Sequence, residues 1–216
     1  EAEPGEKFEY SSNTTVILAD IAADVLTDNS TDPETRRKAV DTYLRTRLFE
    51  PLGMTSMVPE YDAAGTLIGR REGDGPGTFY MGSHQDSVRH GGAYDGIMGV
   101  ALACLAVQNL AETGRTLPFA VEVLAFADEE GGRFPTALIG PRALAGRFDP
   151  DVLTLEDRAG TTLWTAMECF DLDPDGIGAL ARDPEQAFGY LEAHIEQGPV
   201  LEQSGEALGV VTAICG

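Results

Sequence analysis

All three histidines of the chain, His84, His90 and His194, fall in short segments that also carry carboxylates. The segments are GSHQDSVRHGGAYDG, ADEEGGRF and EAHIEQGP. Imidazole nitrogens and carboxylate oxygens are the ligand mixture that binds zinc or manganese in proteins. Together the segments predict a hydrolytic site built around two metal ions.

The first segment offers a metal ligand with its own support. His84 and Asp86 are two residues apart, so in an extended segment their side chains point to one face. We expect Asp86 to accept the second imidazole N–H of His84, which fixes the tautomer of a ligand histidine. Asp95 lies in a turn with small neighbours, where one carboxylate can bridge two cations. A polar loop with an ordinary aspartate is the alternative, and these residues alone leave both interpretations open.

The adjacent carboxylates of the second segment suit two different roles. Glu129 and Glu130 point in different directions, so one can bind metal while the other serves as a general base towards water. An exposed acidic turn is the usual meaning of such a pair. Here the pair directly follows an apolar run and precedes two glycines, which favours a site.

The third segment is the least specific when taken alone. An isolated histidine such as His194 is more often a structural residue than a ligand. Its neighbours Glu192, Glu196 and Gln197 favour a ligand role. His90 is interpreted as a structural or supporting residue.

Hydrophobic periodicity predicts the elements that position these segments. From about residue 65 the chain alternates strands with helices, which indicates a largely parallel sheet covered by helices. Strands are expected at 66–70, 78–83, 119–127 and 207–215, and helices at 99–110, 137–145 and 185–196. Ligands of such sheets bind beyond the carboxyl ends of the strands. His84, Glu129 and Glu130 are therefore expected at one sheet edge, and His194 near the end of a helix.

The first third of the chain is predicted to be helical. Apolar residues recur at helical spacing in 16–26, and the turn-forming run 27–32 ends that segment. Pro33 stands where a first helical turn tolerates it, and a charged helix is expected over 34–49.

Composition excludes several classes of partner. The net charge of −21 argues against nucleic acid or an anionic membrane, because both need clustered Lys and Arg. Three cysteines without a CxxC pair do not predict a disulfide framework, and Cys104 is expected to be a small core residue. With no membrane span and no signal-peptide core in the sequence, we expect a cytoplasmic protein.

Several motifs, in their order along the chain, resemble one enzyme family. They are GSHQDSVRHGGAYDGIMGVALA, LAFADEEGGRF with GPRALAG, YLEAHIEQGPVLE and GVVTAICG. From about Asp62 to Gly216 the chain resembles the hydantoinase/carbamoylase amidases of the metallopeptidase-20 family. The resemblance implies a three-layer α/β sandwich with a mostly parallel sheet. It also implies metal-dependent hydrolysis of linear amide or ureido C–N bonds, with N-carbamoyl-L-amino acids or allantoate-like compounds as substrates; a dipeptidase or aminopeptidase of the same superfamily is the alternative.

The same resemblance implies a ligand set for two divalent ions, Zn or Mn. His84, Asp95 and His194 would hold one ion, while Asp95 and Glu130 would hold the other. The family supplies a last histidine ligand from a segment that returns after a smaller lid and dimerisation domain, and this sequence stops before both. We therefore expect one well-supported metal site and no family-type homodimer. A catalytically inactive metal-binding fragment remains an alternative.

The resemblance also assigns residues around the metal ions. Glu129 would be the general base, and Asp86 would orient His84. Gln197 and Arg142 match motif positions near the substrate or supporting the site.

The front of the chain resembles a different family. PGEKFEYSSNTTVILADI and YLRTRLFEPLGMTSMVPEYDAAGT are similar to serine β-lactamase-like hydrolases, in which a tyrosine placed like Tyr10 assists an upstream Ser-x-x-Lys nucleophile. That nucleophile is absent here, so serine-hydrolase chemistry is not expected. The change of resemblance predicts a chimera of units 1–65 and 66–216, joined near 62–69. The alternative is a divergent amidase in which helix 34–49 takes the place of the family's own N-terminal helix.

Overall fold

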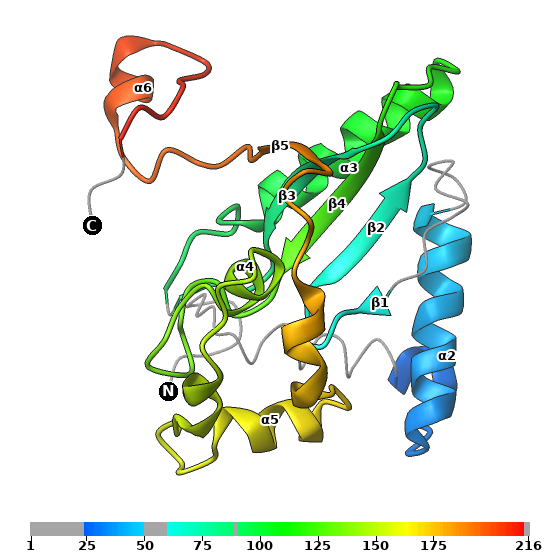
Figure 1. Ribbon diagram of the computed structural model, residues 1–216, viewed down its shortest axis with the longest axis vertical. Helices are drawn as coiled ribbons and strands as arrows, with labels where there is room; N and C mark the ends of the chain where they lie inside the picture. The colour runs from blue at the N-terminus through cyan, green and yellow to red at the C-terminus, as the bar shows by residue number, and fades with distance from the viewer. Residues whose placement is uncertain (1–23, 50–59, 89, 214–216) are drawn as a thin grey trace.

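The computed structural model describes residues 24–49, 60–88 and 90–213 (Figure 1). Most of the predicted helix 16–26, together with Tyr10 and Cys215, lies outside the described residues. The predicted helix 34–49 is confirmed as α2 (Pro33–Leu44), which continues into the π-helical turn η1 (Arg45–Phe49). Asp32 begins α2 by accepting a hydrogen bond from the backbone N–H of Thr35 at 2.8 Å, which satisfies one of the free donors of the first turn.

The described residues contain one five-stranded mixed sheet in the order β1-β2-β4-β3-β5. The strands are β1 (Glu60–Tyr61), β2 (Leu67–Arg71), β3 (Thr78–His84), β4 (Ala120–Phe126) and β5 (Ala187–Leu191). β3 pairs in parallel with both β4 and β5, whereas β2 is antiparallel to β1 and β4. The parallel arrangement expected for the sheet thus holds for the three strands that lead to the predicted site, and an antiparallel hairpin forms the other edge.

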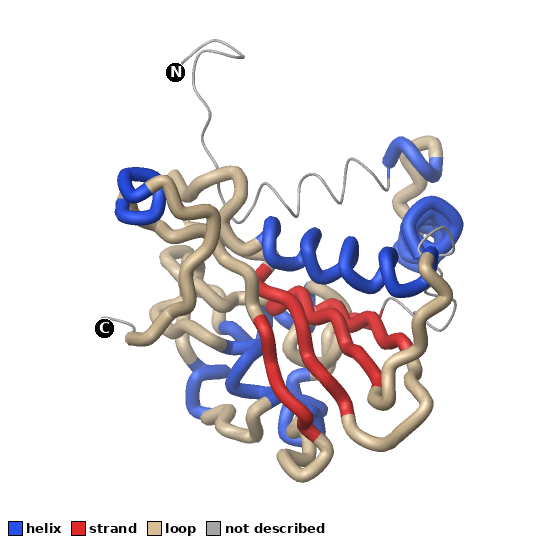
Figure 2. The backbone as a smooth tube through the Cα atoms, turned by 90° about the horizontal axis from the view of Figure 1, so that it is seen from above, coloured by secondary structure: helices blue, strands red, loops and turns tan. Residues whose placement is uncertain are grey.

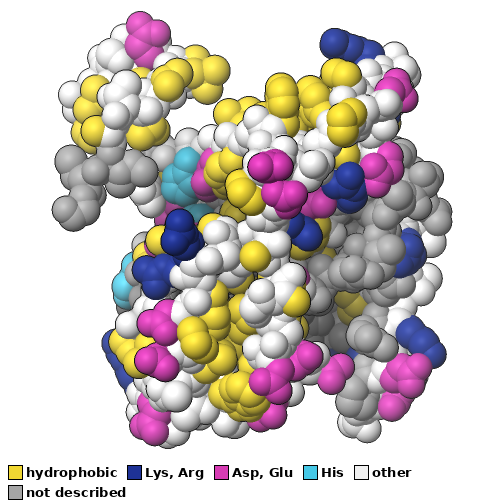
Figure 3. Space-filling model, in the orientation of Figure 1, with side chains coloured by type: hydrophobic (Ala, Val, Ile, Leu, Met, Phe, Trp, Pro, Cys, Tyr) yellow, Lys and Arg dark blue, Asp and Glu magenta, His cyan; other side chains and the backbone are white. Residues whose placement is uncertain are grey.

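Helices cover the sheet on both faces, as a three-layer sandwich requires (Figure 2). The helix predicted at 99–110 is α3 (Ile97–Glu112), which lies over one face and buries Ala103 and Val107 against Val121 and Val123 of β4. Cys104 is half-buried and packs against this cluster, as expected for a small core residue. The outward side of α3 carries exposed hydrophobic side chains, including Leu102 and Leu105 (Figure 3).

Short elements follow β4, and the first of them places Leu144 against Leu124 and Phe126 on the opposite face of the sheet. They are α4 (Ile139–Leu144), the 3-10 turn η2 (Pro150–Thr154), α5 (Leu163–Cys169) and the 3-10 turn η3 (Pro174–Leu180). Their apolar residues form the largest buried cluster, which also takes in Ala64 from the turn between β1 and β2. The hairpin that contains the predicted join is therefore packed into the same core as residues 134–180.

β4 is buried at all seven positions, as its near-continuous apolar sequence predicts. Its one charged residue, Glu122, is 6% exposed. Arg70 and Arg182 donate hydrogen bonds to the two carboxylate oxygens of Glu122 at 3.0 and 3.1 Å. A buried charge of this kind is tolerated because it is paired and hydrogen-bonded.

Two predicted elements after residue 184 are wrong. The segment 185–196 contains the strand β5 instead of a helix, because its residues pair with β3 and Phe188 stacks on Phe119 with ring centroids 4.6 Å apart. The strand predicted at 207–215 is absent from its described part, 207–213, where Val210 and Val211 are exposed. The short helix α6 (Val200–Ser204) precedes this part and lies apart from the sheet (Figure 1).

The structure adds one observation on membrane association. Within the described ranges, no helix is both long enough and apolar enough to cross a bilayer.

Candidate metal centre

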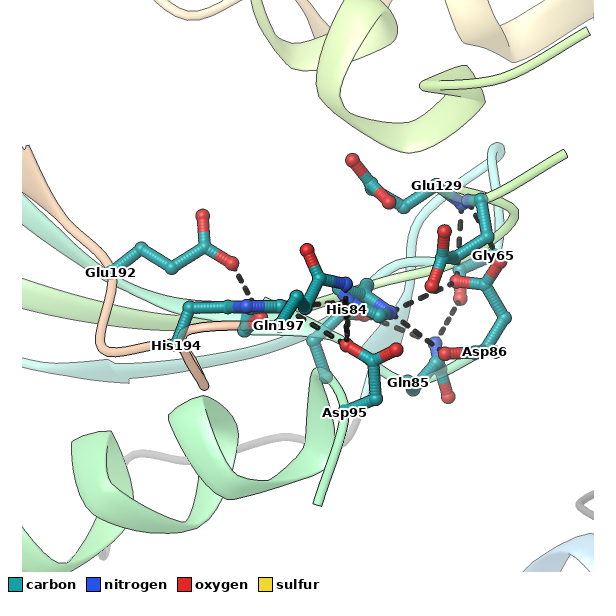
Figure 4. Close-up of polar contacts among 12 residues, drawn as sticks. Gly65, His84, Gln85, Asp86, Asp95, Glu129, Glu192, His194 and Gln197 are labelled. Atoms are coloured by element: carbon teal, nitrogen blue, oxygen red, sulfur yellow. Dashed lines mark hydrogen bonds and ion pairs between the residues drawn. The ribbon is translucent and has the colours of Figure 1, made fainter. Parts of the chain in front are cut away.

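The carboxyl ends of β3 and β4 bring the predicted segments together, as the parallel pairing requires. His84 is the last residue of β3 and lies opposite Phe126, the last residue of β4. Glu129 and Glu130 follow only a few residues later. His194 arrives from β5, the other parallel neighbour of β3, so all three segments meet beside His84 (Figure 4).

His84, Asp95 and His194 form a compact triangle of potential ligand atoms. The Nε2 atoms of the two histidines are 3.2 Å apart. Asp95 Oδ1 lies 3.2 Å from His194 Nε2 and 3.7 Å from His84 Nε2. His84 is 4% exposed and Asp95 8% exposed, while His194 is more open to solvent. The structure thus brings together the three residues proposed for the first metal ion.

The hydrogen bonds at Nδ1 set the tautomer of each imidazole, and with it the state of the Nε2 atom that faces the other ring. His84 Nδ1 lies 2.7 Å from the backbone oxygen of Asp86, and His194 Nδ1 lies 3.0 Å from that of Ile195. A carbonyl oxygen only accepts, so each Nδ1 carries the proton and each neutral ring presents an unprotonated Nε2. Two lone pairs and a carboxylate oxygen then face one small volume. They repel one another unless a cation lies between them, so this donor set fits a divalent metal ion such as zinc or manganese.

Asp86 supports the site in a different way from the one predicted. Its backbone oxygen, and not its carboxylate, accepts the His84 N–H, since Oδ1 is 4.0 Å from Nδ1. The carboxylate instead accepts the backbone N–H groups of Glu129 at 3.1 Å and Glu130 at 3.0 Å. Asp86 therefore ties the turn after β4 to the end of β3.

Glu129 and Glu130 form a second cluster of potential ligands with His84. Burial raises the pKa of both carboxyl groups, and the charge of His84, when it is protonated, opposes that shift. The nearby negative charge of Asp95 also raises the pKa of Glu130, as expected if the two carboxylates face one site. Glu130 Oε1 is buried and has no hydrogen-bond partner among the described residues. An orphaned carboxylate oxygen beside further ligands is the second observation that fits a bound cation.

The backbone is strained in the turn after β4, which carries Glu129 and Glu130. Asp128 has φ 47°, a left-handed conformation that costs energy in residues other than glycine. Burial, followed by the charge of Asp86, raises the pKa of Asp128 to about 6. The backbone N–H groups of Leu138 and Ile139 bond to the carbonyl oxygens of Glu129 and Asp128 and close the loop that holds this conformation.

The remaining predicted residues differ in their relation to the site. Gln197, with φ 56°, reaches the centre and donates a hydrogen bond to Asp95 Oδ1 at 3.4 Å. Arg142 is exposed on α4 and, within the described ranges, makes no hydrogen bond or ion pair with the candidate ligands. His90 is exposed and belongs to neither ligand cluster.

Sequence reasoning assigned no role to the residues that hold the His194 segment in place. The Glu192 carboxylate accepts hydrogen bonds from the hydroxyls of Ser83 and of Tyr190. Gly99 in the first turn of α3 lies directly against the carbonyl oxygen of Ala193, where any Cβ would clash. The alternation of Tyr190, Glu192 and His194 is the signal for a strand that places all three on one face, and the helix predicted for 185–196 concealed it.

A cavity of about 380 Å³ borders the candidate centre between the sheet and α4. Glu129, Glu192 and Arg182 are its charged lining residues. The rest of the lining is formed by Tyr80, Leu124, Phe126, Leu138, Pro141, Leu144, Ala145 and Tyr190. Mainly apolar walls with a few polar groups at the margin are typical of a small-molecule site.

Comparison with known proteins defines the class to which this fold and centre belong. The profile of the family described as "Peptidase family M20/M25/M40" matches residues 79–213, so the chain belongs to that family. Enzymes of this family are metal-dependent, which agrees with the ligand clusters around His84.

Two individual proteins show which members of the family this chain is similar to in sequence. An N-carbamoyl-L-amino acid amidohydrolase of Geobacillus stearothermophilus is 46% identical over 157 residues, which cover 72% of this chain and 38% of that protein. Allantoate deiminase 1 of Glycine max is 37% identical over 185 residues, covering 83% of this chain and 37% of that protein. The chain thus spans less than two fifths of the length of these relatives.

Solved structures of amidases are similar to this chain in fold. A hydantoinase/carbamoylase family amidase from Burkholderia ambifaria matches with a TM-score of 0.60 and 28% identity, covering 88% of this chain and 47% of that one. A hydantoinase/carbamoylase amidase from Burkholderia phymatum matches with a TM-score of 0.61 and 26% identity, covering 93% and 49%. The resemblance to hydantoinase/carbamoylase amidases is confirmed, whereas the serine β-lactamase-like resemblance of the front segment finds no support in these comparisons.

Proposed function

We propose that this chain is the metal-binding part of a hydrolase that cleaves linear amide or ureido C–N bonds. The observation that carries the proposal is the convergence of His84 Nε2, His194 Nε2 and Asp95 Oδ1 on one point, beside Glu129 and Glu130. The chain is 46% identical to an N-carbamoyl-L-amino acid amidohydrolase across this region, which supports the same class of reaction.

The proposed metal ligands divide between two positions. His84, Asp95 and His194 hold the first ion, and Glu130 joins Asp95 at a second, weaker position. Zinc or manganese suits both donor sets, since imidazole and carboxylate are borderline and hard ligands. Cations held there supply Lewis-acid chemistry, lowering the pKa of water and polarising a carbonyl group.

Glu129 is the proposed general base. Burial raises the pKa of its carboxyl group above the usual value of a glutamate, which strengthens it as a proton acceptor. Glu129 takes a proton from the attacking water as the new C–O bond forms. It returns that proton to the leaving nitrogen as the C–N bond breaks. With an N-carbamoyl amino acid, the products are the amino acid, ammonia and carbon dioxide.

The cavity beside Glu129 favours one class of substrate. Its walls are mainly apolar, and Leu124, Phe126 and Leu144 of its lining are buried. An N-carbamoyl amino acid with a large apolar side chain can place that side chain against such walls, whereas allantoate carries only polar groups. We therefore propose N-carbamoyl derivatives of apolar amino acids as substrates. Gln197, which faces Asp95, is proposed to contact the substrate, as is Arg142 on the basis of its motif position alone.

Metal titration combined with a hydrolysis assay tests the proposal. Wild-type chain, stripped of metal and titrated with Zn²⁺ or Mn²⁺, is expected to bind close to two ions and to release ammonia from N-carbamoyl-L-phenylalanine. Faster cleavage of a dipeptide would instead support a peptidase. One weakly bound ion without turnover would support an inactive metal-binding fragment.

The division into units 1–65 and 66–216 stays a prediction. The alignment with the Glycine max protein is longer than the second unit, so it includes residues of the front segment. That extension favours the alternative of one continuous amidase chain. Long sequencing reads across the source gene decide between the two: a continuous gene with close full-length relatives that carry the same front half would exclude the chimera.

A further inference from the structure

His194 reaches the candidate centre from a strand that ends before it. The backbone ladder between β3 and β5 runs as far as the pair Met81 and Leu191. The next residues, 192–194, extend beside the last part of β3 without further strand pairing. His194 therefore depends on contacts other than the sheet ladder for its position.

Glu192 provides the contacts that replace the ladder. One carboxylate oxygen accepts the hydroxyl of Ser83, the residue before His84 on β3 and fully buried. The other oxygen accepts the Tyr190 hydroxyl at 2.9 Å, and that hydroxyl also lies 3.4 Å from the Gly82 carbonyl oxygen. Hydrogen bonds to a carboxylate are stronger than those between neutral groups. Glu192 thus joins the end of β5 to the residues that immediately precede His84.

Packing holds the same segment from the other side. The carbonyl oxygen of Ala193 lies against Gly99, close to Ser83. The imidazole of His194 has its Nδ1 satisfied by the adjacent Ile195 carbonyl, which sets the ring's tautomer but anchors it to no other element. Among the described residues, the hydrogen bonds of Glu192, the contact with Gly99 and the hydrogen bond from Gln197 to Asp95 tie this segment to the body of the fold.

We propose that Glu192 is a positioning residue that, with Ser83 and Tyr190, holds His194 Nε2 within reach of the ion bound by His84 and Asp95. The inference rests on the metal-binding part of the proposed function and not on hydrolysis. Both Glu192 oxygens are engaged by hydroxyl donors, so its action on the ion runs through His194.

The test measures Co²⁺ affinity of the metal-free chain, followed by the visible absorption of bound Co²⁺. Glu192→Ala is expected to weaken Co²⁺ binding about tenfold, the lower end of what outer-shell partners contribute, because Glu192 is exposed. Glu192→Gln keeps an acceptor and loses only the charge, so it is expected to retain most of the affinity and the wild-type spectrum. Glu202→Ala, an exposed carboxylate on α6, is the matched control and should bind as the wild type does.

A second set of variants separates positioning from a simple charge effect. Ser83→Ala combined with Tyr190→Phe removes both donors while keeping the carboxylate, and is expected to reproduce the loss seen with Glu192→Ala. Added to Glu192→Ala, the same pair should cause no further loss, since all three residues act through one set of bonds. Metal-free melting temperature and circular dichroism check the fold; if Glu192→Ala fails to fold, the single donor variants carry the test.

Three outcomes overturn the inference. They are unchanged Co²⁺ affinity in Glu192→Ala, equal losses in Glu192→Gln and Glu192→Ala, and fully additive losses from the donor variants. A wild-type chain that binds Co²⁺ as described but hydrolyses nothing would count against the proposed reaction alone. A wild-type chain that binds no Co²⁺ would overturn the metal centre and this inference together.

Discussion

The two segments that bring ligands to His84 are held in opposite ways. The turn after β4, which carries Glu129 and Glu130, is bonded to Asp86 and closed by backbone hydrogen bonds from Leu138 and Ile139. The segment after β5, which carries His194, is largely exposed and depends on Glu192 and on packing against Gly99. One side of the centre is built into the core, while the other is attached by a few contacts.

This difference has a physical consequence for metal binding. Asp86 bonds the backbone of Glu129 and Glu130 to the end of β3, so ordering this turn around an ion costs little conformational entropy. Residues 192–198 have fewer buried contacts, which is typical of segments that open locally at low free-energy cost. We therefore expect bound metal to order the β5 side more than the β4 side.

The largest effect is expected from the proposed base on the β4 side. Glu129→Gln keeps the size of the side chain but removes its ability to take a proton. Turnover of N-carbamoyl-L-phenylalanine should fall by about 10²–10⁴-fold, the usual contribution of general acid–base catalysis. Steady-state assays measure the loss, and Glu202→Gln is the control. Metal titration should give the wild-type result for the ion at His84, Asp95 and His194; a loss of that ion would make Glu129 a ligand.

Asp86 tests how far the β4 side is part of the core. Asp86→Ala removes two hydrogen bonds to a carboxylate, and we expect the free energy of unfolding to fall by about 3 kcal/mol. Urea denaturation of the metal-free chain measures the change. Glu192→Ala should lower it by much less, since its segment is exposed. Similar losses from the two variants would remove the contrast between the two sides.

The cavity lies between the two sides and should respond selectively. Ala145→Leu, at an exposed cavity-lining position, narrows the space next to α4. We expect kcat/KM for N-carbamoyl-L-phenylalanine to fall about tenfold, because misfit of a few methylene groups costs about 1–3 kcal/mol. The value for N-carbamoylglycine should stay the same. Ala101→Leu, exposed on α3 at the other face of the sheet, is the matched control.

The smallest effect concerns the hairpin that supports the β4 side. Asp62 accepts the N–H groups of Ala64 and Thr66 through Oδ1, while burial raises the pKa of its carboxyl group. A folded-state pKa above the unfolded value means that the native protein binds the proton more tightly, so Asp62's contribution to stability falls as pH rises through the folded pKa. Asp62→Asn keeps the acceptor without the charge.

Urea denaturation of Asp62→Asn at several pH values tests this sign. Relative to the wild type, the variant is expected to gain stability as pH rises from 4 to 7. A variant whose relative stability falls over that range would show that the ionised carboxylate is favourable in the folded protein.

Several features could be predicted because they depend on local sequence. The continuous apolar run at 119–127 is a buried strand, and the expected strand 78–83 ends at His84. Given those two strands, parallel pairing brings His84 and Glu129 to one edge of the sheet. The front helix also follows from Pro33, which stands in its first turn.

The failures have one physical cause, the dependence of strands on partners distant in sequence. Residues 185–196 have the composition of a helix, but Ala187–Leu191 pair with β3 and become β5. Residues 207–213 have the apolar and β-branched composition of a strand, but in the described part of the chain they are exposed and pair with no other strand. The support of His84 was also misjudged, since the Asp86 carbonyl oxygen competes with the carboxylate for the same N–H.

The sequence by itself determined the chemistry of this protein: the histidines and carboxylates, their order, and the two strands that deliver His84 and the glutamate pair. These are properties of residue type and short-range spacing. Only the tertiary structure decided how His194 is delivered, that Asp86 holds the Glu129–Glu130 turn, and that Glu192 joins β5 to β3. Each of those contacts joins residues more than 40 positions apart in the sequence, and local periodicity does not encode contacts over such a separation.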